Sequence, residues 1–460
     1  MSSFPDLENE TTERAYEMES HWVERVLTLI EQQDQPALIA LLDQHHAADI
    51  ADLIEQIKPN QRSGLLKLWG TAVDGEVFAE MDEAISATLI EELSDDAVSG
   101  VVRDLDTDDV VDLVEDLDVG QQERFLEAMD AVDQVAVRSS LSYPEETAGR
   151  LMARELVMAP THWTVGQMID NLRADDALPD QFYDVVVVDP MSKPVGKVPL
   201  SSLLSSARET PLLDIMDEEF RTIPVTQSQE DVAYAFNQYN MVSAPVVDEE
   251  DRLVGVITID DAMEVLGDEA EEDIKLLAGV GDESLTDTIL STTRQRFPWL
   301  GVNLITSILA SIVIAQFSAT IEAIVALAVL MPIVASMGGN AGTQTLTVAV
   351  RALATKDLTS SNAWRVIRRE VLVGLLNGIA FAVIIGALGS FWYGMPLLGL
   401  VLGMAMVINL LVAGLAGILV PLTLDRYNLD PALGSSALVT TVTDVVGFFA
   451  FLGFAAAILL

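Results

Sequence analysis

The sequence predicts a multidomain chain: an acidic all-α repeat domain and an α/β pair of modules, followed by an α-helical membrane domain of five transmembrane helices. Three observations carry this prediction. The net charge of −46 is confined to the first two thirds of the chain, segments repeat about sixty residues apart, and long apolar segments fill the last third. We place the boundaries at 1–144 for the helical domain, 145–266 for the α/β pair, 267–296 for an acidic connecting helix and 297–460 for the membrane domain.

Charge divides the chain sharply. The chain has 25 Lys and Arg against 71 Asp and Glu, and residues 297–460 have six of each kind, so residues 1–296 have 19 basic and 65 acidic residues. Nucleic acid is not an expected partner, because its phosphates would be repelled. Two interpretations of the acidity stay open: carboxylates that hold divalent cations, and a surface adapted to high salt, which the scarcity of Lys also fits.

The chain has no cysteine, so neither disulfides nor thiolate metal sites are expected. Oxygen ligands favour a hard cation over zinc. The first 20 residues lack the apolar run of a cleavable signal, so we expect the acidic region to stay in the cytoplasm and the protein to span the cell membrane. We expect no enzymatic activity, because no nucleophile or metal pattern surrounds the four histidines, which are His21, His45, His46 and His162.

Residues 21–140 have apolar residues at helical spacing and contain an internal repeat. Residues 48–69 and 108–129 share their apolar positions, and a partial copy lies at 95–105. Repeated short helix pairs predict a small solenoid, with a generic helical bundle as the alternative.

Residues 183–204 and 243–266 each read as a strand, a turn, a second strand and a helix. This pair of modules resembles the CBS-domain pair. The second copy reads GVITIDDAM, in which Thr258 and Asp261 occupy the positions that hold a ribose in nucleotide-binding members, so the resemblance implies ATP or another adenine nucleotide as a ligand. The first copy departs from this pattern, since it reads GKVPLSSLL. Asp261 as an ordinary residue of a helix N-terminus is the alternative.

The last third contains five apolar segments, each long enough to cross a hydrocarbon core of about 30 Å. They lie near 298–318, 323–350, 366–392, 396–423 and 433–459. The loops after the first and third segments have no Lys or Arg. The Lys and Arg residues near the five segments lie in the other flanking regions. This asymmetry predicts the N-terminus inside and the C-terminus outside.

The second apolar segment contains MPIVASMGGNAGTQT at 331–345. Pro332 removes a helical hydrogen bond and the glycines permit other backbone geometries, so we expect a broken helix beside a water-filled cavity. Close helix packing through small residues is the alternative. Asn340 and Gln344 favour the pore, because polar side chains at this depth need a wet or paired site.

The fifth apolar segment carries Asp444 near its middle, together with Thr440, Thr441 and Thr443. A carboxylate at this depth costs on the order of 3 kcal/mol and usually faces a cavity. A protonated Asp bonded to a neighbouring helix is the alternative. The sequence places no Lys, Arg or His in the interior of any of the five segments, since Arg368 and Arg369 lie at the very start of the third. An unpaired acid in a pore wall favours cations over anions.

The order of these domains resembles the MgtE family of magnesium channels, and GGNAGTQ and TTVTDVVGFF are similar to the pore motifs of that family. The resemblance covers essentially the whole chain. It implies a homodimer with a pore on its two-fold axis, in which Asp444 of both subunits holds a hydrated Mg²⁺ with Asn340 and Gly339 nearby. Mg²⁺ gives up its waters reluctantly, so recognition through those waters would suit it.

The resemblance also implies regulatory Mg²⁺ sites in the acidic regions. The candidates are Asp261, Glu264, Glu269, Glu272 and Asp273 on the second CBS copy and the connector, Asp430 beside the fifth segment, and Asp108 and Asp112 in the helical domain. We expect intracellular Mg²⁺ to bridge carboxylates that otherwise repel and thereby to close the pore; a solvated acidic face is the alternative. A cation-coupled secondary transporter of divalent metals and a membrane-anchored nucleotide sensor are the other functions considered.

Overall fold

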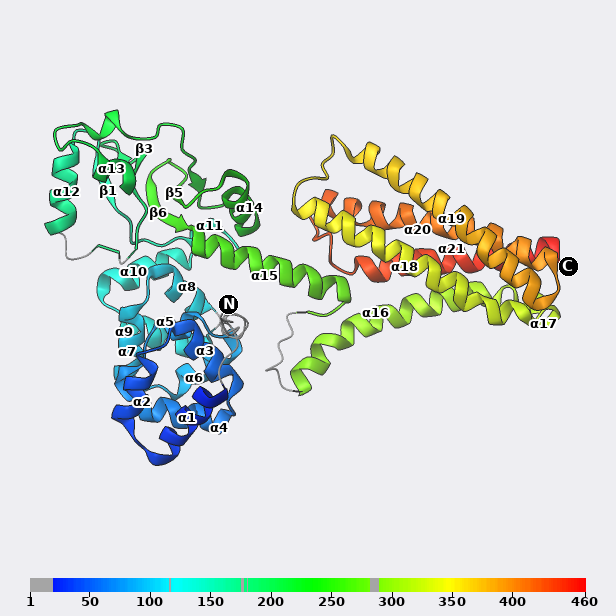
Figure 1. The fold of residues 1–460 in the computed structure, drawn as a ribbon, viewed down its shortest axis with the longest axis horizontal. Helices are drawn as coiled ribbons and strands as arrows, with labels where there is room; N and C mark the ends of the chain where they lie inside the picture. Colours follow the sequence, from blue (N-terminus) through cyan, green and yellow to red (C-terminus); the bar gives the residue numbers. More distant parts are fainter. Residues whose placement is uncertain (1–19, 116, 175–177, 180, 282–288) are drawn as a thin grey trace, which may run out of the picture. The chain divides into compact units, whose positions relative to one another are not determined.

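The computed structural model divides into two compact units, Met1–Leu266 and Gly267–Leu460 (Figure 1). The structure describes residues 20–115, 117–174, 178–179, 181–281 and 289–460. Of the connecting helix predicted at 267–296, residues 282–288 therefore lie outside the described residues.

The first unit begins with short helices that enclose one apolar core, which runs from Trp22 to Val137. They are α1 (Ser20–Gln32), α2 (Gln35–Leu42), α3 (Ala47–Gln56), α4 (Pro59–Trp69), the 3₁₀ turn η1 (Gly70–Ala72), α5 (Glu76–Ala79), α6 (Glu83–Glu92), α7 (Asp95–Asp104), α8 (Thr107–Glu115), α9 (Val119–Ala128), α10 (Ala131–Ser140) and α11 (Ala148–Leu151).

The repeat in the sequence corresponds to two helix pairs, α3–α4 and α8–α9. In each pair, a polar side chain of the second helix donates a hydrogen bond to a carbonyl at the end of the first helix: Arg62 Nε to Ile54 at 2.7 Å, and Gln122 Nε2 to Val114 at 3.0 Å. The last carbonyls of a helix have no partner within it, so this bond ties the two helices together. The predicted repeat of helix pairs is confirmed.

The rest of the first unit contains two similar α/β modules. The first consists of β1 (Met158–Pro160), α12 (Val165–Ala174), β2 (Asp184–Val188), β3 (Pro194–Pro199), α13 (Leu200–Ser205) and the 3₁₀ turn η2 (Leu212–Asp214). The second consists of β4 (Ile223–Pro224), α14 (Gln229–Tyr239), β5 (Ser243–Val247), β6 (Leu253–Thr258) and the start of α15 (Ile259–Ala278). In each sheet the first strand pair is parallel and the second antiparallel.

A buried polar contact joins the two modules. Asp184, at the start of β2, accepts hydrogen bonds from Lys197 Nζ of β3 and from Ser243 Oγ of β5, both at 2.7 Å. Because Asp184 is almost fully buried, the Lys197 ammonium and the Ser243 hydroxyl together replace the water that its carboxylate loses.

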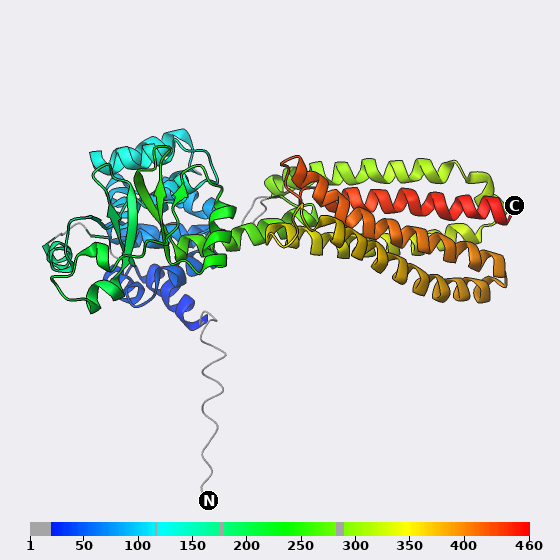
Figure 2. The same cartoon turned by 90° about the horizontal axis from the view of Figure 1, so that it is seen from above.

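Among the residues that the structure describes, the second unit contains five helices that are long and apolar enough to cross a membrane, and Figure 2 shows them side by side. They are α16 (Ile289–Ala315), α18 (Ala326–Ala354), α19 (Ala363–Tyr393), α20 (Pro396–Arg426) and α21 (Ser435–Ile458), with the short α17 (Ser318–Ala323) between the first two. The most enclosed of the five is α20, which packs against α18, α19 and α21. The predicted number of spans is confirmed.

The prediction of a broken second span is wrong, because α18 is one continuous helix. Pro332 lies on its second turn, and neighbouring helices allow a span to tolerate such a residue. The glycines serve close packing instead: a Cβ at Gly342 would lie 2.5 Å from Val439 of α21, and one at Gly338 would overlap the side chain of Asn409 of α20. Small residues let helices approach in this way, which was the alternative interpretation of the motif.

Candidate cation pathway and acidic clusters

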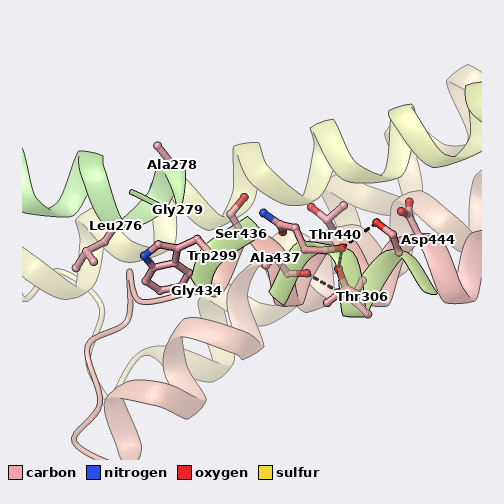
Figure 3. Close-up of a pocket in the computed structure, with 13 residues that line it drawn as sticks. Leu276, Ala278, Gly279, Trp299, Thr306, Gly434, Ser436, Ala437, Thr440 and Asp444 are labelled. Carbon is pink, nitrogen blue, oxygen red and sulfur yellow. Dashed lines mark hydrogen bonds between the residues drawn. The ribbon is translucent and has the colours of Figure 1, made fainter. Parts of the chain in front are cut away.

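The second unit contains a cavity of about 250 Å³ beside the first half of α21 (Figure 3). One wall consists of α16 and the other of α21, while the end of α15 contributes a few residues. The lining residues are Leu276, Ala278, Gly279, Trp299, Asn303, Thr306, Ser307, Gly434, Ser436, Ala437, Thr440, Thr441 and Asp444.

Asp444 is half-buried and lines this cavity, as predicted for an acid at membrane depth. It is the tenth residue of α21, about 14 Å along the helix axis at 1.5 Å per residue. Asp444 makes no ion pair with any of the residues that the structure describes. A cation is therefore a natural partner for this carboxylate.

Hydroxyl groups surround the same cavity with their oxygens available as acceptors. The Thr306 and Ser307 hydroxyls donate to the Asn303 carbonyl at 2.9 and 2.8 Å, and the Thr441 hydroxyl donates to the Ala437 carbonyl at 2.6 Å (Figure 3). Since each hydroxyl proton is used within its own helix, the oxygen lone pairs remain for a cation or for its waters. The arrangement suits a hydrated, hard cation.

The two glycine-motif residues predicted for the pore lie differently. A Cβ at Gly339 would lie 4.0 Å from Thr440 Cγ2, so Gly339 faces the helix that carries Asp444. The Asn340 side chain is exposed, its amide nitrogen lies 3.5 Å from Ser336 Oγ, and it does not line the cavity. A single chain thus brings Gly339, but not Asn340, toward Asp444.

The first unit brings together three carboxylates from the first turns of α8 and α15. Burial, followed by the charge of Asp261, raises the pKa of Asp108 well above its usual value and raises that of Asp109 to about 7. The charge of Asp112 adds a smaller contribution at Asp109. Burial also raises the pKa of Asp261. These carboxylates repel one another in the described arrangement.

Asp261 is also held by its own turn. Its Oδ2 accepts hydrogen bonds from the backbone N–H and the hydroxyl of Thr258, both at 2.9 Å. This is the capping arrangement of a helix N-terminus, so the structural interpretation of the Thr258–Asp261 pair holds in this conformation. A ribose in this place would have to compete for the same carboxylate oxygen.

A second pair of carboxylates lies within the second unit. Burial and the charge of Asp430 raise the pKa of Asp273, whereas Arg351 acts in the opposite direction. Asp430 Oδ1 accepts the backbone N–H of Ala432 at 2.7 Å. The remaining regulatory candidates lie along α15 and are Glu264, Glu269 and Glu272.

No group of three or more His, Asp or Glu side chains among the described residues is arranged to hold a metal ion. In this conformation the acidic positions are repelling charges rather than an assembled ligand set. Assembly of a regulatory site would therefore require the carboxylates to move together.

Family comparisons connect this geometry to known proteins. Residues 331–454 match the MgtE family, described as a divalent cation transporter, residues 45–146 match the MgtE intracellular N domain, and residues 212–268 match the CBS domain. The magnesium transporter MgtE of Thermus thermophilus is 32% identical over 93% of this chain and 96% of its own length. That of Enterococcus faecalis is 36% identical over 67% of this chain and 68% of its own. This chain belongs to the MgtE family of magnesium transporters.

Two solved structures match slightly more than half of this MgtE family member. The soluble part of a magnesium transporter has a TM-score of 0.50 and 26% identity, and the match covers 55% of this chain and all of that one. The cytosolic domain of the Mg²⁺ channel MgtE in complex with ATP has the same score and identity and covers 53% of this chain and 99% of that one. The curated relatives are named as magnesium transporters.

Sequence reasoning missed two features of the MgtE chain. Asp109 has a pKa raised to about 7, and the acidic doublet with Asp108 at the start of a helix was the signal that could have identified it. The second feature is the polar face of α16, which includes Asn303 and Thr306. These residues lie three apart within the first apolar segment, and this helical spacing was the signal that could have identified them.

Proposed function

We propose that the chain is a Mg²⁺ channel formed by two copies, with Asp444 of each copy holding a hydrated Mg²⁺. The observation that carries this proposal is a carboxylate in the middle of a span that lines a cavity together with hydroxyl oxygens. Asn340 and Gly339 belong to the same pathway, and the exposed Asn340 amide is available to a second copy. A relative is named as a Mg²⁺ channel, which supports a channel rather than an enzyme or an anchor.

The membrane potential provides the driving force. Moving one elementary charge through 100 mV is worth about 2.3 kcal/mol, so a divalent ion gains about 4.6 kcal/mol without any coupled ion. This energy is useful for uptake if the acidic first unit is cytoplasmic and the C-terminus is outside. The one-sided placement of Lys and Arg in the loops supports that orientation.

Intracellular Mg²⁺ closes the channel by bridging carboxylates that repel in its absence. Two places support this proposal: Asp108 beside Asp261 in the first unit, and Asp273 beside Asp430 in the second. Asp112 and three of the four glutamates of α15, Glu264, Glu269 and Glu272, are the further carboxylates of this proposal. Mg²⁺ shifts the equilibrium only through its higher affinity for the closed arrangement, in which more carboxylates reach the ion.

Adenine nucleotide binding at the CBS pair is a second proposal. A matching solved structure is that of the cytosolic domain of a relative in complex with ATP, and Thr258 and Asp261 are the residues that the sequence predicts for the ribose. Since Asp261 also belongs to the acidic cluster, nucleotide and Mg²⁺ would affect one another there.

Electrical recording from the purified protein in planar bilayers tests the channel. We expect unitary Mg²⁺ currents whose reversal potential follows the Mg²⁺ gradient, and we expect Mg²⁺ on the side of the acidic unit to lower the open probability. Na⁺ at equal ionic strength is the control and should leave the channel open. Flux that depends on a second ion gradient and produces no unitary currents would support the coupled transporter instead.

A further inference from the structure

Asn409 of α20 is a polar residue buried inside the helix bundle of the second unit. Its side chain is fully buried, and its Nδ2 donates a hydrogen bond to the Val334 carbonyl of α18 at 2.7 Å. Its Oδ1 is also buried and has no hydrogen-bond partner among the residues described. The amide therefore connects α20 to α18 and presents a bare acceptor within an apolar bundle.

Two glycines from different helices enclose this amide. A Cβ at Gly338 of α18 would lie 2.8 Å from Asn409 Oδ1, and a Cβ at Gly447 of α21 would lie 3.0 Å from the same atom. On each glycine, a hydrogen atom takes the place of that Cβ and points at the amide. The two glycines thus leave room for the whole amide group and supply no N–H or O–H donor for its oxygen.

The two glycines are neighbours of the predicted pore residues. Gly338 precedes Gly339 and Asn340 directly, and Gly447 follows Asp444 by three residues, which is nearly one helical turn. The Asn409 amide thus lies between the helix that carries the glycine motif and the helix that carries the carboxylate. A change in the size or the hydrogen bonding of the Asn409 amide would therefore move α18 relative to α21.

We propose that Asn409 is a positioning residue of the cation pathway, which sets the spacing between the Gly338–Asn340 segment of α18 and Asp444 on α21. The inference rests on the proposed function, because it assumes that ions pass beside Asp444. A leucine has the same number of non-hydrogen side-chain atoms, although its methyl groups are larger, and it would remove the cost of burying an unpaired acceptor. The geometry of the pathway therefore explains an amide at position 409 better than the stability of the helix bundle does.

The first test replaces the amide by a side chain with the same number and branching of non-hydrogen atoms. Asn409→Leu should fold and melt at or above the wild-type temperature, because the Val334 carbonyl keeps its place in the α18 ladder. Mg²⁺ flux into proteoliposomes should fall at least roughly tenfold, since ion sites depend on geometry held within about 0.5 Å. The ratio of Mg²⁺ to Ca²⁺ flux should change as well, which a purely structural residue would not cause. Asn377→Leu, which removes an exposed amide from α19, is the matched control and should retain flux and ratio.

A second pair of variants decides the matter if Asn409→Leu does not fold. Gly338→Ala should lose flux, because its methyl group would overlap the Asn409 amide. Adding Asn409→Ala removes the overlap and should restore the melting temperature but not the ion ratio. A double variant with wild-type flux and ratio would reduce the amide to a space filler and overturn the inference.

Asp444→Asn measured in parallel separates this inference from the proposed function. If Asp444→Asn loses flux while Asn409→Leu matches the wild type in flux and ratio, only the positioning role fails. If Asp444→Asn itself keeps wild-type flux, the proposed pathway fails, and the role of Asn409 fails with it.

Discussion

Buried carboxylates occur in both units, but their surroundings differ. In the first unit, burial and the charge of Asp261 raise the pKa values of Asp108 and Asp109. In the second unit, Asp444 lies in a cavity lined by the hydroxyl groups of Thr440 and Thr441, without an ion pair among the described residues. Repulsion between crowded carboxylates raises the free energy of the conformation that brings them together. An isolated carboxylate attracts a cation without changing how the surrounding helices pack.

This difference corresponds to two tasks. A sensor must change the conformation when the ion binds, and repelling carboxylates do so because the ion removes their repulsion. A pathway must bind an ion and release it again, which is easier for a single carboxylate of each subunit acting through water. The three predictions that follow test this contrast.

The largest effect is expected at the isolated acid. Asp444→Asn keeps size and polarity but removes the charge, so Mg²⁺ flux into proteoliposomes should fall by about 100-fold, equivalent to roughly 3 kcal/mol of lost ion stabilisation. Asp444→Glu should do less harm, because the charge remains and only one methylene is added. Glu322→Gln removes the same charge from an exposed position on α17 and should leave flux unchanged. Wild-type flux and Mg²⁺ preference in Asp444→Asn would return this residue to a protonated, structural role.

A smaller effect is expected in the crowded cluster. Asp108→Asn removes one repelling charge, so the full-length protein in Mg²⁺-free detergent solution should melt a few degrees higher, about 2–4 °C per kcal/mol for a domain of this size. Mg²⁺ should protect the first unit of the wild type from protease, and this protection should be weaker in the variant. Glu127→Gln on α9 removes an exposed charge and serves as the control. Equal protection of the wild type by Na⁺ at the same ionic strength would favour salt adaptation as the reason for the acidity.

The smallest effect is the pH dependence of the same cluster. A folded-state pKa above the unfolded value means that the folded protein binds more protons, so stability decreases as pH rises through the folded value. With the pKa of Asp109 at about 7 against an ordinary value of 3.8, the Mg²⁺-free melting temperature should decline between about pH 4 and pH 7. Asp109→Asn should flatten this decline. Identical slopes in both proteins would show that the cluster does not carry the effect.

Sequence alone determined the order of the domains and the number of spans. Apolar length and helical spacing are local properties, and the sixty-residue repeat predicted the helix pairs that α3–α4 and α8–α9 form. Asp444 was identifiable because a single acidic residue within an apolar segment can be recognised from the sequence without knowing its spatial neighbours. The same local patterns predicted the pair of α/β modules from one strand, turn, strand and helix repeated.

Tertiary structure decided what these residues face. The local sequence around Gly338 and Gly342 is the same whether these glycines interrupt a helix or allow another helix to pack closely. The close approach of α20 and α21 shows that they allow close packing. The repulsion between Asp108 and Asp261 joins residues more than 150 positions apart, so no sequence window contains it. Likewise, Asn409 is one amide in an apolar segment until the glycines of two other helices enclose it. Burial and electrostatic interaction depend on distances between elements, and those distances exist only in the folded chain.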